Sequence, residues 1–519
     1  MAVFELVIGL LLAGAVLAHW ARKWNAPYPA LLALAGTAGA VVPGLPAATL
    51  DPDLALALFV APVLLDAAYD ASPRDLRDNW IPVTGLVVFA VGTTVLAVAL
   101  LARALLPEMP WAAALALGAI VAPPDASAAA AVLRQLRPPH RVLVILEGES
   151  LLNDATALLI YRVAVGAAMA GTGVGWGVVP ELLLTVGGGV VLGVVLARLF
   201  FALTAPAEEL AIIVLAQFLG TFAVWLIAER LGVSAIITVV AFAITIARRA
   251  PLRSNARRRI ASYAVWEVAV FVLNVLAFIL IGLQLRGILE RLDGGSWRDF
   301  GFALGASAVV ILVRFAWVMG YNTFVRWKNA RFGMRTARPM APPTWQGGII
   351  ISWCGMRGIV TIAAALALPE GFPQRDLILL AAFSVALVTL VAQGLTLRWL
   401  MRRLGMRDDG TVQQEVVLAR RCTAEAALAL LGEARETGAA RLLRQEYAAR
   451  VAAAEADARP EDAALAALQH KAVAEQRRVL GRLRAEGRIG DDAFHVVEEE
   501  IDLLELSADP RLRRLADGG

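Results

Sequence analysis

The stretch EGESLLNDATALLIYRVAVGA, residues 147–167, places three carboxylates at the front of a segment that is otherwise almost entirely apolar. Glu147, Glu149 and Asp154 supply the acids, and Arg162 is the one other charge. An apolar run of about 20 residues is long enough to cross the hydrocarbon core of a bilayer. Ionisable groups inside such a run are costly, so they indicate a functional site.

The composition of the whole chain is that of a polytopic membrane protein. Of its 519 residues, 59% are hydrophobic and 18% are charged, and the mean hydropathy is +0.68. A soluble domain has about 45–50% apolar and about 25% charged residues. The apolar runs fill residues 1–405, whereas residues 406–519 are charged and rich in alanine. We therefore predict an all-α protein with a transmembrane domain over 1–405 and a cytoplasmic helical tail over 406–519.

Thirteen apolar ranges are predicted to span the bilayer: 2–18, 27–47, 54–70, 80–106, 111–136, 141–170, 177–202, 209–230, 233–248, 264–288, 300–325, 345–368 and 374–402. Lysine and arginine test this count, because they gather in cytoplasmic loops. They concentrate in every second loop through all thirteen ranges. We therefore expect a multi-pass protein of the cell (inner) membrane, with the N-terminus outside and the tail in the cytoplasm. The same bias explains most basic residues, so we expect no nucleic-acid partner.

The acids of the opening stretch are predicted to lie at mid-membrane depth. If the helix begins near Arg141, Asp154 lies about 20 Å along its axis. Ser150 is four residues before Asp154 and shares its face of the helix. A hydroxyl and a carboxylate are hard oxygen ligands that suit an alkali cation or a proton. The alternative for Glu147 and Glu149 is that they only mark a helix start near the membrane interface.

Two other ranges predict helices that break inside the membrane. In GAIVAPPDASAAAAVL, residues 118–133, a pair of prolines ending at Pro124 removes helix hydrogen bonds, and Asp125 follows at once. In WCGMRGIVTIAAALAL, residues 353–368, glycines flank Arg357. Interrupted helices in corresponding positions of two halves point to inverted repeats around a transport site. The alternatives are an ordinary proline kink capped by Asp125, and an Arg357 that reaches the interface from a helix end.

Two further charged residues fall inside predicted spans. Arg314 needs a carboxylate partner if it is buried, and Glu149 is the leading candidate. Asp66, in APVLLDAAYD, is another intramembrane acid. The alternative for Asp66 is a position near the cytoplasmic end of its span.

These motifs resemble those of the monovalent cation/proton antiporters, in the NhaP-type branch that includes animal sodium/proton exchangers. The signature is EGESLLNDATAL, supported by PPDA at 123–126, WEVAVFVLNVLAFILIGLQL at 266–285, CGMRGIVTIAAALAL at 354–368 and VAQGLTL at 391–397. The resemblance covers residues 55–400 and implies about 13 transmembrane helices with inverted repeats and two crossing unwound helices. It also implies a moving core over about 80–170 and 300–402, and a dimer scaffold over about 2–70 and 177–288.

The resemblance assigns the cation and proton site to a group of polar residues. Asp154 would bind the cation and the proton in turn, with Ser150 as a further ligand of the alkali cation. Asp66, where Glu is usual in the family, would help to coordinate the ion. Asn153 would place the chain in the Asn-Asp branch, which is associated with electroneutral exchange. Asp125 would complete the set.

The resemblance gives structural roles to the remaining residues. Glu149 and Arg314 would form an ion pair that holds the core. Asp125 and Arg357 would compensate helix-end dipoles where the unwound helices cross. The chain departs from the family pattern at Pro124, where many members have a threonine whose side chain is a cation ligand in some of them.

The predicted function is secondary antiport of a monovalent cation, Na⁺ or Li⁺, for H⁺ by alternating access, in a homodimer within the lipid bilayer. The alternative is K⁺/H⁺ exchange by the same mechanism. An intramembrane aspartyl protease using Asp125 and Asp154, or a channel, are rival classes; the protease leaves Arg357 and the interrupted helices unexplained. No phosphate-binding loop of the GxxxxGK[ST] kind occurs, so we expect an ion gradient as the driving force and no ATPase. As a transporter, the chain is expected to need no cofactor and to be no enzyme. The tail is expected to be regulatory, or else a helical appendage that affects assembly.

Overall fold

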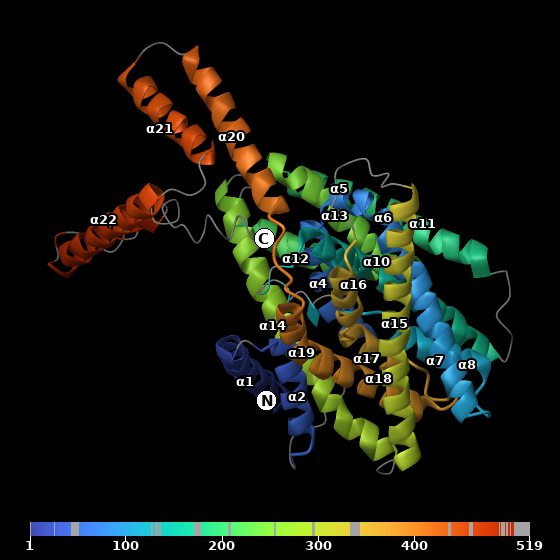
Figure 1. The fold of residues 1–519 in the computed structure, drawn as a ribbon. Coiled ribbons are helices and arrows are strands. Elements are labelled where there is room, and N and C mark those ends of the chain that lie inside the picture. The colour runs from blue at the N-terminus through green and yellow to red at the C-terminus, as the bar shows by residue number, and fades with distance from the viewer. Residues whose placement is uncertain are drawn as a thin grey trace. The chain divides into compact units, whose positions relative to one another are not determined.

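The structure is a computed structural model that describes most of the chain. The described residues are 2–24, 26–42, 51–125, 138–170, 178–205, 209–253, 256–292, 296–332, 343–433, 437–455 and 460–486, with the isolated positions 128, 129, 133, 136, 488, 494, 497, 498 and 500–502. Among these residues every regular element is helical, as the sequence predicts (Figure 1). The chain divides into two compact units, Met1–Arg407 and Asp408–Gly519.

The first unit is a bundle of apolar helices. Its helices are α1 (Ala2–Trp24), α2 (Tyr28–Ala40), α3 (Pro52–Ala55), α4 (Ala61–Asp70), α5 (Pro73–Asp78), α6 (Trp80–Thr84), α7 (Val91–Leu105), α8 (Trp111–Val121), α10 (His140–Ala170), α11 (Val178–Thr204), α12 (Leu210–Arg230), α13 (Ala235–Arg253), α14 (Ala256–Arg291), α15 (Trp297–Phe332), α16 (Trp345–Trp353), α17 (Ile359–Leu366), α18 (Arg375–Val388) and α19 (Gly394–Arg403). Eight stretches of helix in the described residues are long and apolar enough to cross a membrane.

Each predicted span overlaps a helix or consecutive helical segments of this unit, and residues 43–47 and 177 of these spans lie outside the described residues. The range 111–136 is described as helix up to Val121, and residues 126, 127, 130–132, 134 and 135 lie outside the described residues. The total of thirteen membrane crossings stays a prediction, as do the division into core and scaffold and the inverted repeats.

Three of the long helices contain a π-helical segment that the sequence did not predict. These segments are η1 (Leu56–Val60) between α3 and α4, η2 (Gly85–Ala90) between α6 and α7, and η3 (Thr389–Gln393) between α18 and α19. A π-helical turn inserts one extra residue into the hydrogen-bond ladder, and such turns occur frequently at functional sites. Two of them, η1 and η3, contribute residues to the ion path and the helix breaks described below.

Helices α2 and α14 approach each other through facing glycines. A Cβ atom on Gly282 would lie 2.3 Å from the carbonyl oxygen of Ala33, and one on Gly36 would lie 2.2 Å from the carbonyl oxygen of Ile279. Small residues at such positions let helix backbones pack closely inside a membrane. The contact between α2 and α14 therefore depends on these two residues lacking side chains.

The second unit consists of helices too. Helices α20 (Thr411–Gly432) and α21 (Gly438–Glu455) pack against each other, and the Arg444 guanidinium joins them by donating to the carbonyl oxygen of Leu431 at 2.7 and 2.9 Å. Helix α22 (Pro460–Ala485) begins at Pro460, and proline is favoured at the start of a helix. Val473, Leu480 and Ile501 form a small apolar cluster there.

We predict that Gly282→Val lowers the free energy of unfolding by about 1–3 kcal/mol, because an added side chain must push α14 away from α2. The measurement is the thermal unfolding midpoint of the purified protein in detergent. Gly287→Val is the matched control on the same helix, because no atom lies within 4 Å of a Cβ placed there. Equal midpoints for the two variants would contradict the close packing of α2 on α14.

Candidate functional site

Two interrupted helices meet at their breaks. Helix α8 ends at Val121, and the backbone from Ala122 to Asp125 is not helical. The second break separates α16 from α17. The backbone N–H of Asp125 donates to the carbonyl oxygen of Met356 at 2.6 Å, so the two breaks are joined directly. The structure therefore brings together two segments that lie more than 200 residues apart in the sequence.

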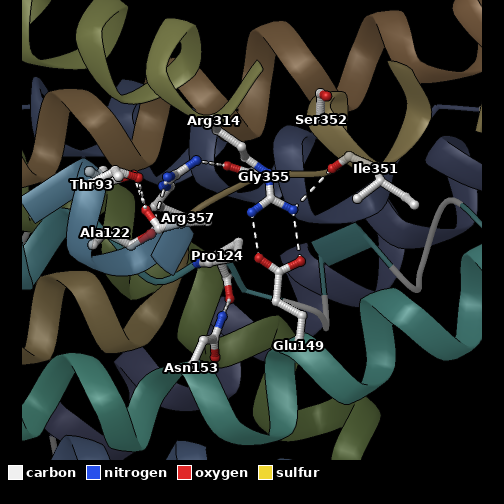
Figure 2. Close-up of polar contacts among 12 residues, drawn as sticks. Thr93, Ala122, Pro124, Glu149, Asn153, Arg314, Ile351, Ser352, Gly355 and Arg357 are labelled. Carbon is white, nitrogen blue, oxygen red and sulfur yellow. Dashed lines mark hydrogen bonds and ion pairs between the residues drawn. The ribbon is translucent and has the colours of Figure 1, made fainter. Parts of the chain in front are cut away.

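Arg357 occupies the point where the breaks meet. Its side chain is buried, and it donates from Nε to the carbonyl oxygen of Val121 at 3.0 Å and from Nη2 to that of Ala122 at 3.1 Å (Figure 2). Nη1 donates to the carbonyl oxygen of Gly355, and the backbone N–H donates to Thr389 Oγ1 at 3.0 Å. The last carbonyls of a helix lack partners and form the negative end of its dipole. The guanidinium therefore satisfies the C-terminal end of α8.

Asp125 lies at the N-terminal end of a helix, α17, whereas Arg357 lies at the C-terminal end of α8. A Cβ atom on Gly358, which precedes α17, would fall 1.6 Å from Asp125 Oδ2. The carboxylate is thus in direct contact with the N-terminal end of α17, where a negative charge is favoured. The two breaks hold one charge of each sign, and each charge faces the helix end that stabilises it.

Glu149 and Arg314 form a bidentate ion pair inside the bundle. The distances are 2.8 Å from Arg314 Nη2 to Glu149 Oε2 and 2.5 Å from Nη1 to Oε1 (Figure 2). Both side chains are at most 3% exposed. Arg314 Nη2 also donates to the carbonyl oxygen of Ile351 at 3.0 Å. The pair therefore joins α10, α15 and α16, and the two parallel hydrogen bonds fix its geometry.

Asn153 connects α10 to the first break. Its side chain is completely buried, and Nδ2 donates to the carbonyl oxygen of Pro124 at 2.9 Å. Its Oδ1 atom has no hydrogen-bond partner among the described residues. Through this bond the residue next to Asp154 is held at a fixed place relative to the break that carries Asp125.

A cavity of about 1040 Å³ lies beside these contacts, and four of the predicted ligands line it: Asp66, Asp125, Ser150 and Asp154. Along α10 the exposure falls from Glu147, which is exposed, through the half-buried Ser150 to Asp154, which is 8% exposed. The cavity therefore opens at Glu147 and ends at Asp154. Asp125 and Asp154 are close enough to interact electrostatically. The other predicted site residues, Asn153, Glu149, Arg314, Arg357 and Pro124, are buried and do not line the cavity.

Further polar residues that sequence reasoning missed line the same cavity, among them Asp70, Glu267 and Asn274. Glu267 and Asn274 are seven residues apart on α14, so they lie on one face of that helix. Asp70 is four residues after Asp66 on α4 and shares its face. Their signal was an acid or an amide in an apolar run, the same signal that singled out Asp66.

Outside the apolar helices, a polar contact fixes the start of α10. His140 Nε2 lies 3.1 Å from Asp75 Oδ2 on α5, and Arg74 Nε donates to Asp75 Oδ1 at 3.0 Å. Burial alone would raise the pKa of Asp75, but the hydrogen bonds from Arg74, His140 and Ser72 outweigh it and hold the pKa of this carboxyl below its ordinary value. Helix α10, which lines the large cavity, is therefore anchored at the end where the cavity opens.

Known proteins that are similar to this chain are sodium/hydrogen exchangers and a related cation/proton antiporter. Residues 6–403 match the family described as "Sodium/hydrogen exchanger, transmembrane". The chain is 32% identical to an uncharacterised Na⁺/H⁺ exchanger of Mycobacterium tuberculosis H37Rv, over 96% of this chain and 94% of that protein. It is 30% identical to the sodium, potassium, lithium and rubidium/H⁺ antiporter of Bacillus subtilis, over 66% of this chain and 53% of that protein.

A solved structure has a similar fold. The structure of the sodium proton antiporter MjNhaP1 from Methanocaldococcus jannaschii at pH 8 superposes with a TM-score of 0.57 at 18% identity. The match covers 78% of this chain and 100% of that one. At this identity the likeness concerns the fold.

We predict that Glu149→Ala destabilises the protein by about 3–5 kcal/mol, because it leaves the buried Arg314 charge without its carboxylate. The thermal unfolding midpoint in detergent measures the effect. Glu147→Ala, on the same helix but exposed, should cost less than about 1 kcal/mol.

The double variant Glu149→Leu, Arg314→Met separates charge burial from packing. It should recover most of the loss, since no unpaired charge remains. If Glu149→Ala and Glu147→Ala unfolded at the same temperature, the Glu149–Arg314 pair would contribute nothing to the stability of the fold.

Proposed function

Since this chain belongs to the sodium/hydrogen exchanger family and is a cation/proton antiporter, we propose that Asp154 is the group at which the cation and the proton compete. One observation carries this proposal. Asp154 is the most buried of the acids along the large cavity, it stands at the cavity's closed end, and the Ser150 hydroxyl is one helical turn away.

Burial explains why one carboxylate couples two fluxes. A desolvated carboxylate is costly when it is bare, and it is stabilised when a proton or a cation neutralises it. Both occupants use the same oxygens, so they exclude each other. If only the neutralised forms of the site change access, each cation that moves one way is matched by protons that move the other way.

The ligand set follows from the residues around the cavity. The Asp154 carboxylate and the Ser150 hydroxyl offer hard oxygens on one face of α10, and Asp66 and Asp125 face the same cavity. Pro124 has no side-chain oxygen, and its carbonyl oxygen accepts from Asn153. Ion binding in this chain would therefore rest on carboxylates and Ser150.

The surrounding contacts support a rigid body that carries the site. The Glu149–Arg314 pair and the Arg357 contacts join α8, α10, α15, α16 and η3. The residues that make these contacts lie within the ranges 80–170 and 300–402, which we propose move as the core against the scaffold ranges 2–70 and 177–288. We place the protein as a homodimer in the cell membrane, with its N-terminus outside and the tail in the cytoplasm.

Na⁺ is the proposed cation, with Li⁺ as a smaller substitute. K⁺ is a second candidate, because the Bacillus subtilis relative is named for sodium, potassium, lithium and rubidium. The one-to-one exchange expected of the Asn153-Asp154 pair is electroneutral.

The relatives are transporters, so the chain is a transporter and not an enzyme, which removes the aspartyl protease alternative. We propose a regulatory role for the helical tail.

We predict that Asp154→Asn abolishes exchange, because an amide can neither hold a proton in turn nor balance the cation charge. The measurement is dequenching of a pH-sensitive dye in energised everted vesicles on addition of NaCl, LiCl or KCl. Wild-type protein should respond to Na⁺ and Li⁺, and Asp154→Asn should give less than about a hundredth of that rate. Glu108→Gln, an exposed acid in the loop between α7 and α8, is the matched control.

The outcomes separate the alternatives. A response to K⁺ alone would keep the mechanism and change the cation. Exchange that survived in Asp154→Asn would overturn the assignment of the shared site. A rate that depends on membrane potential when the potential is clamped with valinomycin would contradict electroneutral exchange, and a cation conductance without proton movement would indicate a channel.

A further inference from the structure

A second cavity, of about 110 Å³, lies beyond Asp154. Residues of α10 from Glu147 to Asp154 line the large cavity, and residues from Ala155 to Arg162 line the small one. Helix rise places Arg162 about 12 Å further along the axis than Asp154. The two cavities therefore follow each other along α10, with Asp154 at the change from one to the other.

Two other segments pass from one cavity to the other at the same level. Along α17, Ile359 and Val360 line the large cavity, whereas Ala364 and Ala367, the residue just after the helix, line the small one. The continuous segment α3–η1–α4 runs the opposite way, with Asp53 and Leu56 on the small cavity and Phe59 onwards on the large one. Three separate segments thus place the two cavities end to end.

The wall between the cavities is apolar. It consists of buried side chains that are each at most 9% exposed and belong to one apolar cluster: Leu56, Phe59, Leu151, Ala155, Val360 and Ala363. A hydrated cation cannot pass such a wall, because it would lose its water ligands without replacement. Leu56 and Phe59 come from the π-helical segment η1, whose irregular backbone forms part of the wall.

The far end of the small cavity is polar. Glu229, in the last turn of α12, accepts a hydrogen bond from Trp225 Nε1 at 2.8 Å, and Trp225 is almost fully buried. Glu229 also interacts electrostatically with Asp53 and Arg162, which are both exposed. The rigid indole therefore fixes one carboxylate at the edge of the small cavity, beside one further acid and one arginine.

We propose that the small cavity is the closed half of the ion pathway, and that Glu229, held by Trp225, receives the cation at that end. The inference rests on the proposed function, since it extends the path away from Asp154. When the apolar wall parts, a cation released by Asp154 meets Glu229 about two helical turns further on. Asp53 and Arg162 also line the small cavity, so the cation meets a second acid and one arginine at this end.

The test compares the two sides of the membrane. The first turns of α12 and α14 line one further cavity, which Asp66 also lines. Both helices therefore end on the opposite face of the membrane. Glu229, in the last turn of α12, lies on that opposite face. Glu229→Gln should raise the KM for Na⁺ presented on that face by about fivefold, as expected for loss of one nearby carboxylate in a partly solvated site. The KM for Na⁺ presented on the face of Glu147 should change by less than about twofold.

Matched variants isolate the role of Glu229. Glu290→Gln removes an acid near the end of α14 that pairs with Arg286 and does not line the small cavity, and it should leave both KM values unchanged. Trp225→Phe removes the hydrogen bond but keeps an aromatic ring, and it should raise KM on the same face as Glu229→Gln does. Right-side-out and everted vesicles give the two measurements. Equal KM changes on both faces, or none, would overturn the assignment.

A steric variant tests the cavity itself. Ala367→Phe would fill the small cavity and should lower turnover at least about tenfold from both sides, with a normal gel-filtration profile and melting point. Gly371→Phe, where a side chain meets open space, is the control. A folded Ala367→Phe protein with normal turnover would show that ions do not use this route. Loss of exchange in Asp154→Asn together with silent Glu229 variants would refute this inference alone and leave the proposed function standing.

Discussion

Broken backbone inside a membrane is the constraint on which the rest of this structure depends. Each helix that stops in the bundle leaves carbonyl or N–H groups that no water can satisfy. In this chain the two breaks satisfy each other. Arg357 takes the carbonyl end of α8, Asp125 faces the N-terminal end of α17, and Asp125 N–H binds the Met356 carbonyl. The absence of a side chain at Gly358 is a condition of this arrangement, since it lets Asp125 approach.

The charges in the bundle divide into two kinds. Glu149 and Arg314 are buried against each other and have two short hydrogen bonds, so neither is offered to the cavity. Asp154 is also buried, but it lines the cavity, and the partner proposed for it is mobile. Asn153 links the two kinds, because it sits beside Asp154 and is bound to the break through Pro124. The carboxylate whose partner changes, Asp154, therefore lies close to an ion pair that stays fixed, Glu149–Arg314.

Much of this arrangement could be predicted from local signals. The length of the apolar runs gave the helices, the prolines before Asp125 and the glycines around Arg357 gave the breaks, and burial of Arg314 required an acid such as Glu149. The features that were missed depend on tertiary contacts. Nothing in the sequence around Leu56 distinguishes a π-helical turn from an α-helical one. Glu267 was in view within a quoted motif, but its place on the cavity followed only from the packing of α14.

The falling exposure along α10 has a kinetic consequence for the ion. Over seven residues, about 10 Å, the lining changes from the exposed Glu147 through the half-buried Ser150 to the buried Asp154. A cation on this route would give up its hydration shell in stages, with a protein oxygen available at each helical turn to replace departing water. The dehydration barrier would then be divided into several small steps. If all the water were lost in one step, the high barrier would keep the ion at the entrance of the cavity. Loss of water in stages lets the ion reach the buried Asp154 and still leave quickly.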